Sequence, residues 1–188
     1  MNNFIDAVSG KFSLTDDFGI GPGTSENVVR SLVPRNMAAV LIDNPPYCSY
    51  VLQGEPHLDR LFRSTLFFKG GALNSLSCVF ETLGEPARSR DSSVAAFAEE
   101  LQFQDHVLQN ALGEPHMRVN HWREKYDDPR LAALASKVPL YIYSWGVVVS
   151  LWGGHDLGVA IEITYRRFDP DDVQRWRRLG EVPKLIRL

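Results

Sequence analysis

The sequence predicts one α+β domain spanning residues 1–188, in which an antiparallel sheet built from hairpins packs with several helices. Strand-like runs come in consecutive pairs joined by short turns, which is typical of antiparallel sheets. Helical patterns lie between these pairs and do not alternate with single strands, so the rhythm of an α/β fold is missing. Apolar residues make up 44% and charged residues 23% of the chain, which is the ordinary balance of a globular protein.

Four strands are expected before the long helix, and the last two of them form a hairpin. Asn44, Pro45 and Pro46 break the first pair of runs, and Gly70 and Gly71 link the second pair, where both glycines are free to adopt positive φ. The alternation of apolar and polar residues slips once near Ser75, in the fourth run. The four runs are residues 36–43, 47–53, 63–68 and 72–81.

A second hairpin is expected near the C-terminal end. Residues 139–152 form its first strand, residues 157–167 its returning strand, and residues 153–156 the turn between them. Every second residue of the returning strand from Val159 to Tyr165 is apolar, and several intervening residues are polar. This spacing predicts one buried face and one wetter face, as in an antiparallel sheet that helices cover on one side.

Two helices have clear signals at their ends. The longest is expected over residues 91–112, where Gly113 provides the glycine that commonly follows a helix. The last helix is expected after Asp169, with Pro170 at its first position and Gly180 at its end. Acidic residues fill the first turn of this last helix, where the helix dipole favours them.

Two further helices are expected to be short. Thr24 or Ser25 caps the first of them, and Pro34 closes it. The second covers residues 129–137. The stretch 118–126 between the long helix and this one fits neither a helix nor a strand pattern clearly.

Charge and targeting signals predict a cytoplasmic protein with neither nucleic acid nor membrane as a direct partner. The net charge is −3, and acidic residues outnumber basic ones by six over residues 1–165. The tail, residues 166–188, carries seven basic and four acidic residues, which we interpret as a solvated helical face. The N-terminus lacks the basic and apolar regions of a secretory signal, and no apolar stretch approaches the roughly 20 residues of a membrane span.

Motifs that carry chemistry are weak in this sequence, so we expect no catalytic residue, no metal and no cofactor. The glycine loop 19–23 lacks the Gly-Lys-Ser/Thr ending of a phosphate-binding loop, and we interpret it as the entry to a capped helix. Two of the five histidines, His116 and His121, are five residues apart, which does not place them on one helical face. Cys48 and Cys78 lie in apolar runs, where cysteine behaves as a small hydrophobic residue.

Two features of the long helix need an explanation from the fold. Asp105 falls inside the apolar stripe between Leu101 and Leu108, so we expect it to find a basic or hydroxyl partner. Phe103 and Val107 lie nearly opposite that stripe, among acidic and polar residues. Either the helix is sandwiched between two layers, or this apolar pair is a docking patch with an acidic rim.

The segment 120–128 combines aromatic and acidic residues. Tryptophan and tyrosine dominate binding hot spots, and acidic residues around them suit a basic partner. The alternative is that Trp122 fills the core. On the first interpretation the partner-binding residues are Glu99, Glu100, Phe103, Trp122, Glu124, Tyr126, Asp127 and Asp128.

The general layout, including the hairpins at 64–81 and 145–165, resembles that of the cytoplasmic immunity proteins of bacterial toxin–immunity pairs, as found with type VI secretion or polymorphic toxins. The resemblance implies that the chain binds and neutralises a cognate protein toxin acting in the cytoplasm, commonly a nuclease. Other functions stay open: a hydrolase-type enzyme with a dispersed site around Asp105 and a histidine, or a structural or adaptor subunit. The exposed edge of either hairpin could also pair with a second copy in a homodimer.

Overall fold

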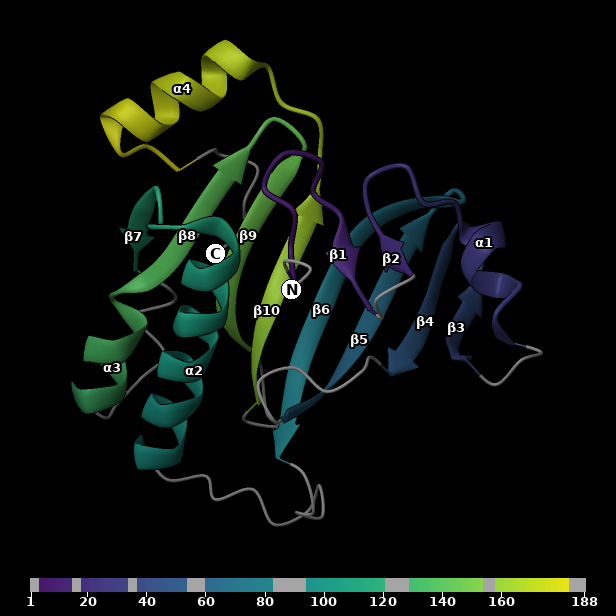
Figure 1. Ribbon diagram of the computed structural model, residues 1–188, viewed down its shortest axis with the longest axis horizontal. Coiled ribbons are helices and arrows are strands. Elements are labelled where there is room, and N and C mark those ends of the chain that lie inside the picture. The colour runs from purple at the N-terminus through teal and green to yellow at the C-terminus, as the bar shows by residue number, and fades with distance from the viewer. Residues whose placement is uncertain are drawn as a thin grey trace.

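The computed structural model describes residues 4–14, 18–33, 37–53, 60–82, 94–120, 129–153 and 158–182. These residues form an eight-stranded antiparallel sheet, a two-stranded sheet and four helices, which confirms the predicted α+β class (Figure 1). The strands are β1 (Phe12–Ser13), β2 (Gly19–Ile20), β3 (Ala38–Asn44), β4 (Tyr47–Gln53), β5 (Arg60–Lys69), β6 (Ala72–Thr82), β7 (Met117–Val119), β8 (Val138–Tyr143), β9 (Gly146–Gly153) and β10 (Gly158–Tyr165). The helices are α1 (Glu26–Arg30), α2 (Val94–Leu112), α3 (Pro129–Ala135) and α4 (Pro170–Leu179).

The large sheet consists of two four-stranded meanders that join in its middle. Its strand order is β3-β4-β5-β6-β10-β9-β8-β7, so each strand of a meander lies beside the next one in the chain. The two meanders meet where β10 pairs antiparallel with β6. β3 and β7 are therefore the two edges of the sheet, at opposite sides of the molecule (Figure 1).

The hairpin between β5 and β6 forms as its turn residues predict. Gly70 and Gly71 have φ values of 59° and 79°, in the left-handed region that favours glycine. The register of this pair shifts between Phe67 and Phe68, opposite the part of β6 that contains Ser75. The slip in the apolar alternation near Ser75 is therefore a β-bulge.

The prediction of one strand over residues 139–152 is wrong, because the chain reverses within it. Ser144 and Trp145 form a tight turn that separates β8 from β9. Gly146 follows this turn, and a Cβ atom built on it would lie 2.3 Å from the backbone oxygen of Thr164. Only glycine allows β9 to begin so close to β10, and this glycine inside an apolar run was the available sign of the reversal.

One face of the sheet, which we call the α2 face, carries the larger core. The two-stranded sheet β1–β2, α1 and α2 lie over this face (Figure 1). Aromatic residues from the N-terminal segment pack closely there: Phe4 lies 4.6 Å from Phe12 and 5.3 Å from Phe62 between ring centroids. The N-terminal segment is thus part of the core, although its sequence shows no regular period.

The opposite face, which we call the α4 face, has a smaller core near β7–β9. Phe168 and Val173 pack there against strand residues that include Leu140 and Val149. α4 forms as predicted, with the Asp169 side chain accepting a hydrogen bond from the backbone of Asp171. The alternation predicted for the returning strand is confirmed in β10: Ile161, Ile163 and Tyr165 are buried in the core of the α2 face, while Glu162 is partly buried and Thr164 is exposed.

Helix α2 is rotated relative to the predicted stripe. Its buried residues are Phe97, Gln104, Val107 and Leu108, and Gly113 follows its end with a φ of 78°. Val107 is 1% exposed and belongs to the core, and it does not form a docking patch. Among the helices that the structure describes, none is long and apolar enough to cross a membrane.

The two short predicted helices, α1 and α3, also form, but each is shorter than the sequence pattern predicts. Ser25 stands at the N-cap of α1, although its side chain makes no capping hydrogen bond there. Instead, the Thr24 hydroxyl accepts a hydrogen bond from the backbone of Gly21 at 2.9 Å. Gly19 and Ile20 form β2, so the glycine loop is a strand and turn that lead into α1.

Candidate functional site

A buried polar cluster holds α2 on the sheet. The Gln104 side chain is 0% exposed and donates a hydrogen bond to the backbone oxygen of Val159 at 2.8 Å. The Ser150 hydroxyl donates to its amide oxygen at 2.6 Å, and Glu100 accepts a second bond from its amide nitrogen at 3.1 Å. Because these partners come from β9, β10 and α2, the cluster fixes the rotation of the helix on the sheet.

Glu100 and Phe103, two residues of the predicted partner-binding set, make intramolecular contacts at one site. Arg60 of β5 forms an ion pair with Glu100 at 2.5 Å, and its guanidinium lies 3.9 Å from the centre of the Phe103 ring. Phe103 also packs edge-to-face on Phe80 with 5.1 Å between centroids. The Arg60–Glu100 ion pair and the Phe103 ring are only partly exposed, so a partner would contact only their solvent-exposed atoms.

Asp105 has the basic partner that its place in the helix predicts. The Arg118 guanidinium of β7 lies 3.0 Å from its carboxylate, and the Gln109 amide donates to the same group at 3.2 Å. The Asp105 side chain is 25% exposed, so this is a partly solvated ion pair. The pair joins the edge strand β7 to α2.

The two histidines that the structure describes, His106 and His116, are hydrogen-bonded to residues other than Asp105. The ring of His106 is hydrogen-bonded to Asn110 at 2.9 Å. The Nδ1 atom of His116 accepts a bond from the backbone of Ile142 at 2.9 Å, and burial lowers the pKa of this ring to about 4. Within the described ranges, no group of three or more His, Cys, Asp or Glu residues could hold a metal ion. Cys48 and Cys78 are buried and unpaired with one another.

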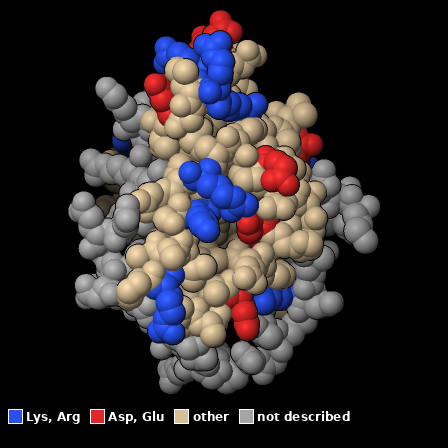
Figure 2. Space-filling view, turned by 90° about the vertical axis from the view of Figure 1, so that its left-hand side faces the viewer, with Lys and Arg blue, Asp and Glu red and all other residues tan. Residues whose placement is uncertain are grey.

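The remaining predicted binding residues divide between α2 and a segment outside the described residues. Glu99 is partly exposed on α2. Trp122, Glu124, Tyr126, Asp127 and Asp128 lie outside the described residues. The side of the molecule shown in Figure 2 carries lysine and arginine side chains interspersed with aspartate and glutamate, so the part of this side that is described has mixed charge.

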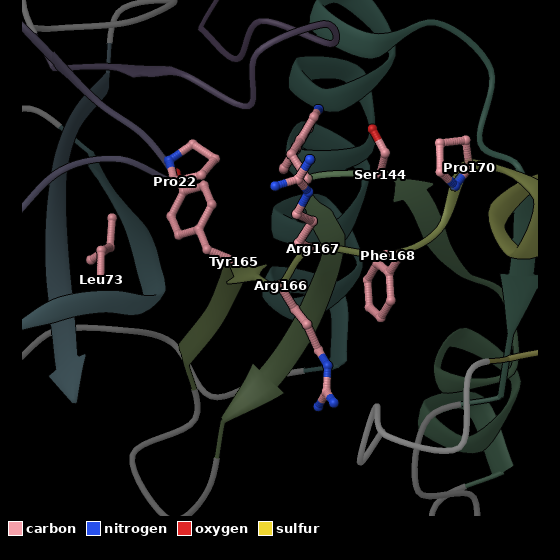
Figure 3. A pocket seen from close by; sticks show the side chains of 9 residues that line it. Pro22, Leu73, Ser144, Tyr165, Arg166, Arg167, Phe168 and Pro170 are labelled. Carbon is pink, nitrogen blue, oxygen red and sulfur yellow. The ribbon is translucent and has the colours of Figure 1, made fainter. Parts of the chain in front are cut away.

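A pocket that the sequence did not predict lies where β10 ends and α4 begins. It has a volume of about 460 Å³, within the range of small-ligand pockets. In Figure 3 the Tyr165 ring points toward Pro22, and Arg166 points away from both. The residues that line the pocket are Pro22, Leu73, Ser144, Trp145, Tyr165, Arg166, Arg167, Phe168 and Pro170.

The pocket is supported by a stack of aromatic rings. Trp145 stacks on Tyr143 with 4.9 Å between centroids, and its indole nitrogen donates to the backbone of Ala7 at 2.9 Å. Gly10 passes so close to this indole that a Cβ atom there would lie 2.5 Å from the ring. The aromatic wall is therefore rigidly positioned, while Arg166 and Arg167 are exposed at its rim.

Most of the large apolar side chains that are exposed in the described residues gather elsewhere, along the β3 edge. Val40, Leu41 and Ile42 are 46%, 59% and 48% exposed, and Tyr47 in the neighbouring strand is 54% exposed. Aliphatic residues at this exposure are unusual in a cluster on the surface of a monomer. The sequence suggested that an exposed edge of the hairpin at 64–81 or of the hairpin at 145–165 could pair with another chain. The sheet order places both hairpins inside the sheet and puts β3 at an edge.

One solved structure matches the chain. No protein-family model matches the chain, and no curated protein matches it. The chain is similar to a chain in the solved structure of Rhs1-CT in complex with cognate immunity protein RhsI1, with 14% identity and a TM-score of 0.47. The similarity covers 94% of this chain and 96% of that chain. At this identity and TM-score, the function has to be argued from the residues.

Proposed function

We propose that the chain binds and neutralises a cognate protein toxin that acts in the cytoplasm. In this proposal the protein works without catalysis, by covering the active or substrate-binding surface of the toxin. The face that does so is acidic and contains aromatic anchors. Its residues are Glu99, Glu100, Phe103, Trp122, Glu124, Tyr126, Asp127 and Asp128.

The observation that carries this proposal is the position of the elements that flank residues 121–128. β7 ends at Val119 and is tied to α2 by the Arg118–Asp105 ion pair. α3 begins at Pro129 and also contacts α2. Both flanking elements therefore lie against the helix that carries Glu99. β7 contacts the Asp105 flank of this helix, whereas Glu100 and Phe103 face Arg60 of β5.

The chemistry of the partner follows from the charge of this chain. Acidic residues outnumber basic ones by six over residues 1–165, and the segment 121–128 carries three acidic and two basic residues. A nuclease must hold phosphates with basic side chains, so an acidic inhibitor suits its substrate-binding surface. We therefore propose a nuclease as the toxin.

The partner candidate is the product of the reading frame adjacent to the gene for this chain. We expect the two proteins to co-purify, and co-expression of this chain to restore growth of cells that produce the toxin. Reversing Glu124, Asp127 and Asp128 together to lysine should slow association at least about tenfold, because rim charges act mainly on the association rate. The salt dependence of association should also become shallower.

A matched control changes the same number of charges elsewhere. Asp171, Asp172 and Glu181 lie on α4 or directly after it, and their reversal to lysine alters the net charge equally. If both triple variants slow association equally, only net charge matters and the proposed face is wrong. If the adjacent product neither binds nor is neutralised, the proposed function itself is wrong.

A further inference from the structure

β3 is an edge strand whose large apolar side chains are exposed. It is hydrogen-bonded to β4 on one side only, and each of its residues after Ala38 is exposed. Natural edge strands are commonly short, charged, interrupted by proline or covered. The other edge, β7, has three residues, and Arg118 is one of them. β3 has seven residues, and an aliphatic run lies at its centre.

Exposed apolar residues extend from β3 across two neighbouring strands. Ile42 is paired with Ser49, and Ser49 is paired with Phe67 on its other side, so Ile42 and Phe67 flank a short polar residue in one row. Six of the nine large hydrophobic residues that are exposed in the described chain belong to this region. We call them the apolar edge: Met37, Val40, Leu41, Ile42, Tyr47 and Phe67.

The size of the apolar edge fits an interface between two copies. Val40 and Ile42 lie on opposite faces of the edge, because their partners Tyr50 and Ser49 are consecutive residues of β4. From the exposed fractions, the six side chains together have an accessible area of roughly 500 Å². Two such patches in contact remove about 1,000 Å² from water, close to the smallest area of a specific interface. A second copy supplies this matching surface without any further assumption about its chemistry.

We propose that the apolar edge is covered by the apolar edge of a second copy of this chain, in a two-fold symmetric homodimer. Two β3 strands that run antiparallel place the alanine end of each strand, Ala38 and Ala39, beside the Asp43 end of the other. The two carboxylates are thereby kept apart. Each is also paired with Arg30 of its own chain at 3.0 Å, so the charged ends do not oppose the contact.

Leu41 lies at the centre of this contact. The pairing of β3 with β4 shifts register between Val40 and Ile42, so Leu41 has no partner residue in β4. A bulge of this kind twists an edge and disfavours a long regular ladder with a further strand. The contact is therefore made mainly by side chains, and its modest area suggests a dissociation constant in the micromolar range.

The oligomeric state of the full chain in solution tests this inference. Sedimentation equilibrium from about 1 to about 300 µM should show a reversible monomer–dimer equilibrium. Leu41→Lys should raise the dissociation constant at least about tenfold, because it buries two charges without partners. Leu179→Lys is the matched control, since Leu179 is 55% exposed on α4 and Leu41 is 59% exposed. This control should leave the equilibrium unchanged.

A cross-link tests the geometry separately from the affinity. Leu41→Cys places a thiol near the proposed two-fold axis, where its counterpart in the second copy can lie within disulfide distance. The native Cys48 and Cys78 are buried, so mild oxidation should give a covalent dimer with this variant and none with Leu179→Cys.

The inference is wrong if the chain is a monomer at all concentrations tested. It is also wrong if Leu41→Lys does not weaken the dimer, or if Leu41→Cys dimerises like the wild type but does not cross-link. The dimer inference does not depend on the toxin. If the chain dimerises but binds no toxin, only the proposed function is wrong. A monomer whose β3 amides become protected from hydrogen exchange only when the toxin binds would overturn the dimer and move the toxin site to this edge.

Discussion

Glu162 makes the stability of the protein depend on pH in a way that can be calculated from its position. It lies in β10 between Ser77 of β6 and Val149 of β9. Burial raises the pKa of this carboxyl from 4.5 to about 7, and a hydrogen bond with the Ser77 side chain lowers it to a smaller extent. At neutral pH the folded protein therefore keeps a proton that the unfolded chain has released.

The sign and size of the effect follow from proton linkage. Between pH 4.5 and about 7 the folded state binds more protons at Glu162 than the unfolded state, so the free energy of unfolding decreases as pH rises. Each unit of pKa difference corresponds to about 1.4 kcal/mol, so the loss reaches about 3 kcal/mol above pH 7. Glu162→Gln removes the titration while it preserves the shape and the hydrogen-bonding capacity of the side chain.

The measurement is urea denaturation of the wild type and Glu162→Gln from pH 4.5 to 8.5. The free energy of unfolding of Glu162→Gln, relative to that of the wild type, should increase by about 3 kcal/mol over this range. For a domain of this size, such a difference shifts the unfolding temperature by roughly 6–12 °C. Glu114→Gln is the control, because Glu114 is exposed, and its difference from the wild type should stay flat. A difference for Glu162→Gln that is independent of pH would refute the reasoning.

The wild-type profile alone is a poor test, because His116 titrates in the opposite direction. Burial lowers the pKa of this histidine from 6.5 to about 4. Between these pH values the unfolded chain is protonated at His116 and the folded state is not. Stability due to His116 is therefore lost as pH falls from 6.5 toward 4. The effects of Glu162 and His116 on the free energy of unfolding therefore have opposite pH dependence over much of the acidic range. Comparison with Glu162→Gln isolates the contribution of Glu162.

Three further substitutions test the packing of the described residues, each by urea denaturation at pH 7. Tyr165→Phe should be neutral or stabilising by up to about 1 kcal/mol, because the buried hydroxyl has no hydrogen-bond partner in the described part of the chain. Gln104→Ala should cost about 3 kcal/mol, since it leaves the Ser150 hydroxyl and a backbone oxygen unpaired; a cost below about 1 kcal/mol would show that the cluster does not hold α2. Arg118→Ala should cost at most about 1 kcal/mol, because its ion pair with Asp105 is partly solvated.

The sequence predicted the elements whose signals are local. Gly70 and Gly71 fix a turn, and Gly113 and Gly180 end helices with φ values of 78° and 67°. Asp169 caps α4 through its own side chain. Each of these residues acts on backbone within a few positions of itself, so its effect does not depend on which strands are neighbours.

The wrong predictions concern features of the fold that tertiary contacts determine. In α2 the rotation of the helix depends on a buried amide, Gln104, whose partners are 46 and 55 residues away in β9 and β10. A count of apolar residues at helical spacing cannot assign a glutamine to the buried side, so it placed Asp105 where Gln104 lies. Likewise Phe12 belongs to the core through a two-residue strand that is too short to show a period, and Phe4 belongs to the core from outside any strand.

The β3 edge shows why the candidate interface could not be located from the sequence and why its pattern still matters. A continuous aliphatic run such as Val40, Leu41 and Ile42 is typical of a strand buried on both faces. The strand order, which no local signal encodes, puts this run at the edge of the sheet and leaves it exposed. A sequence pattern for burial on a strand that the monomer exposes fits the proposed reversible contact with a second copy, since apolar surface held in water is costly. Leu41→Lys should accordingly leave the unfolding free energy of the monomer nearly unchanged and weaken only the association.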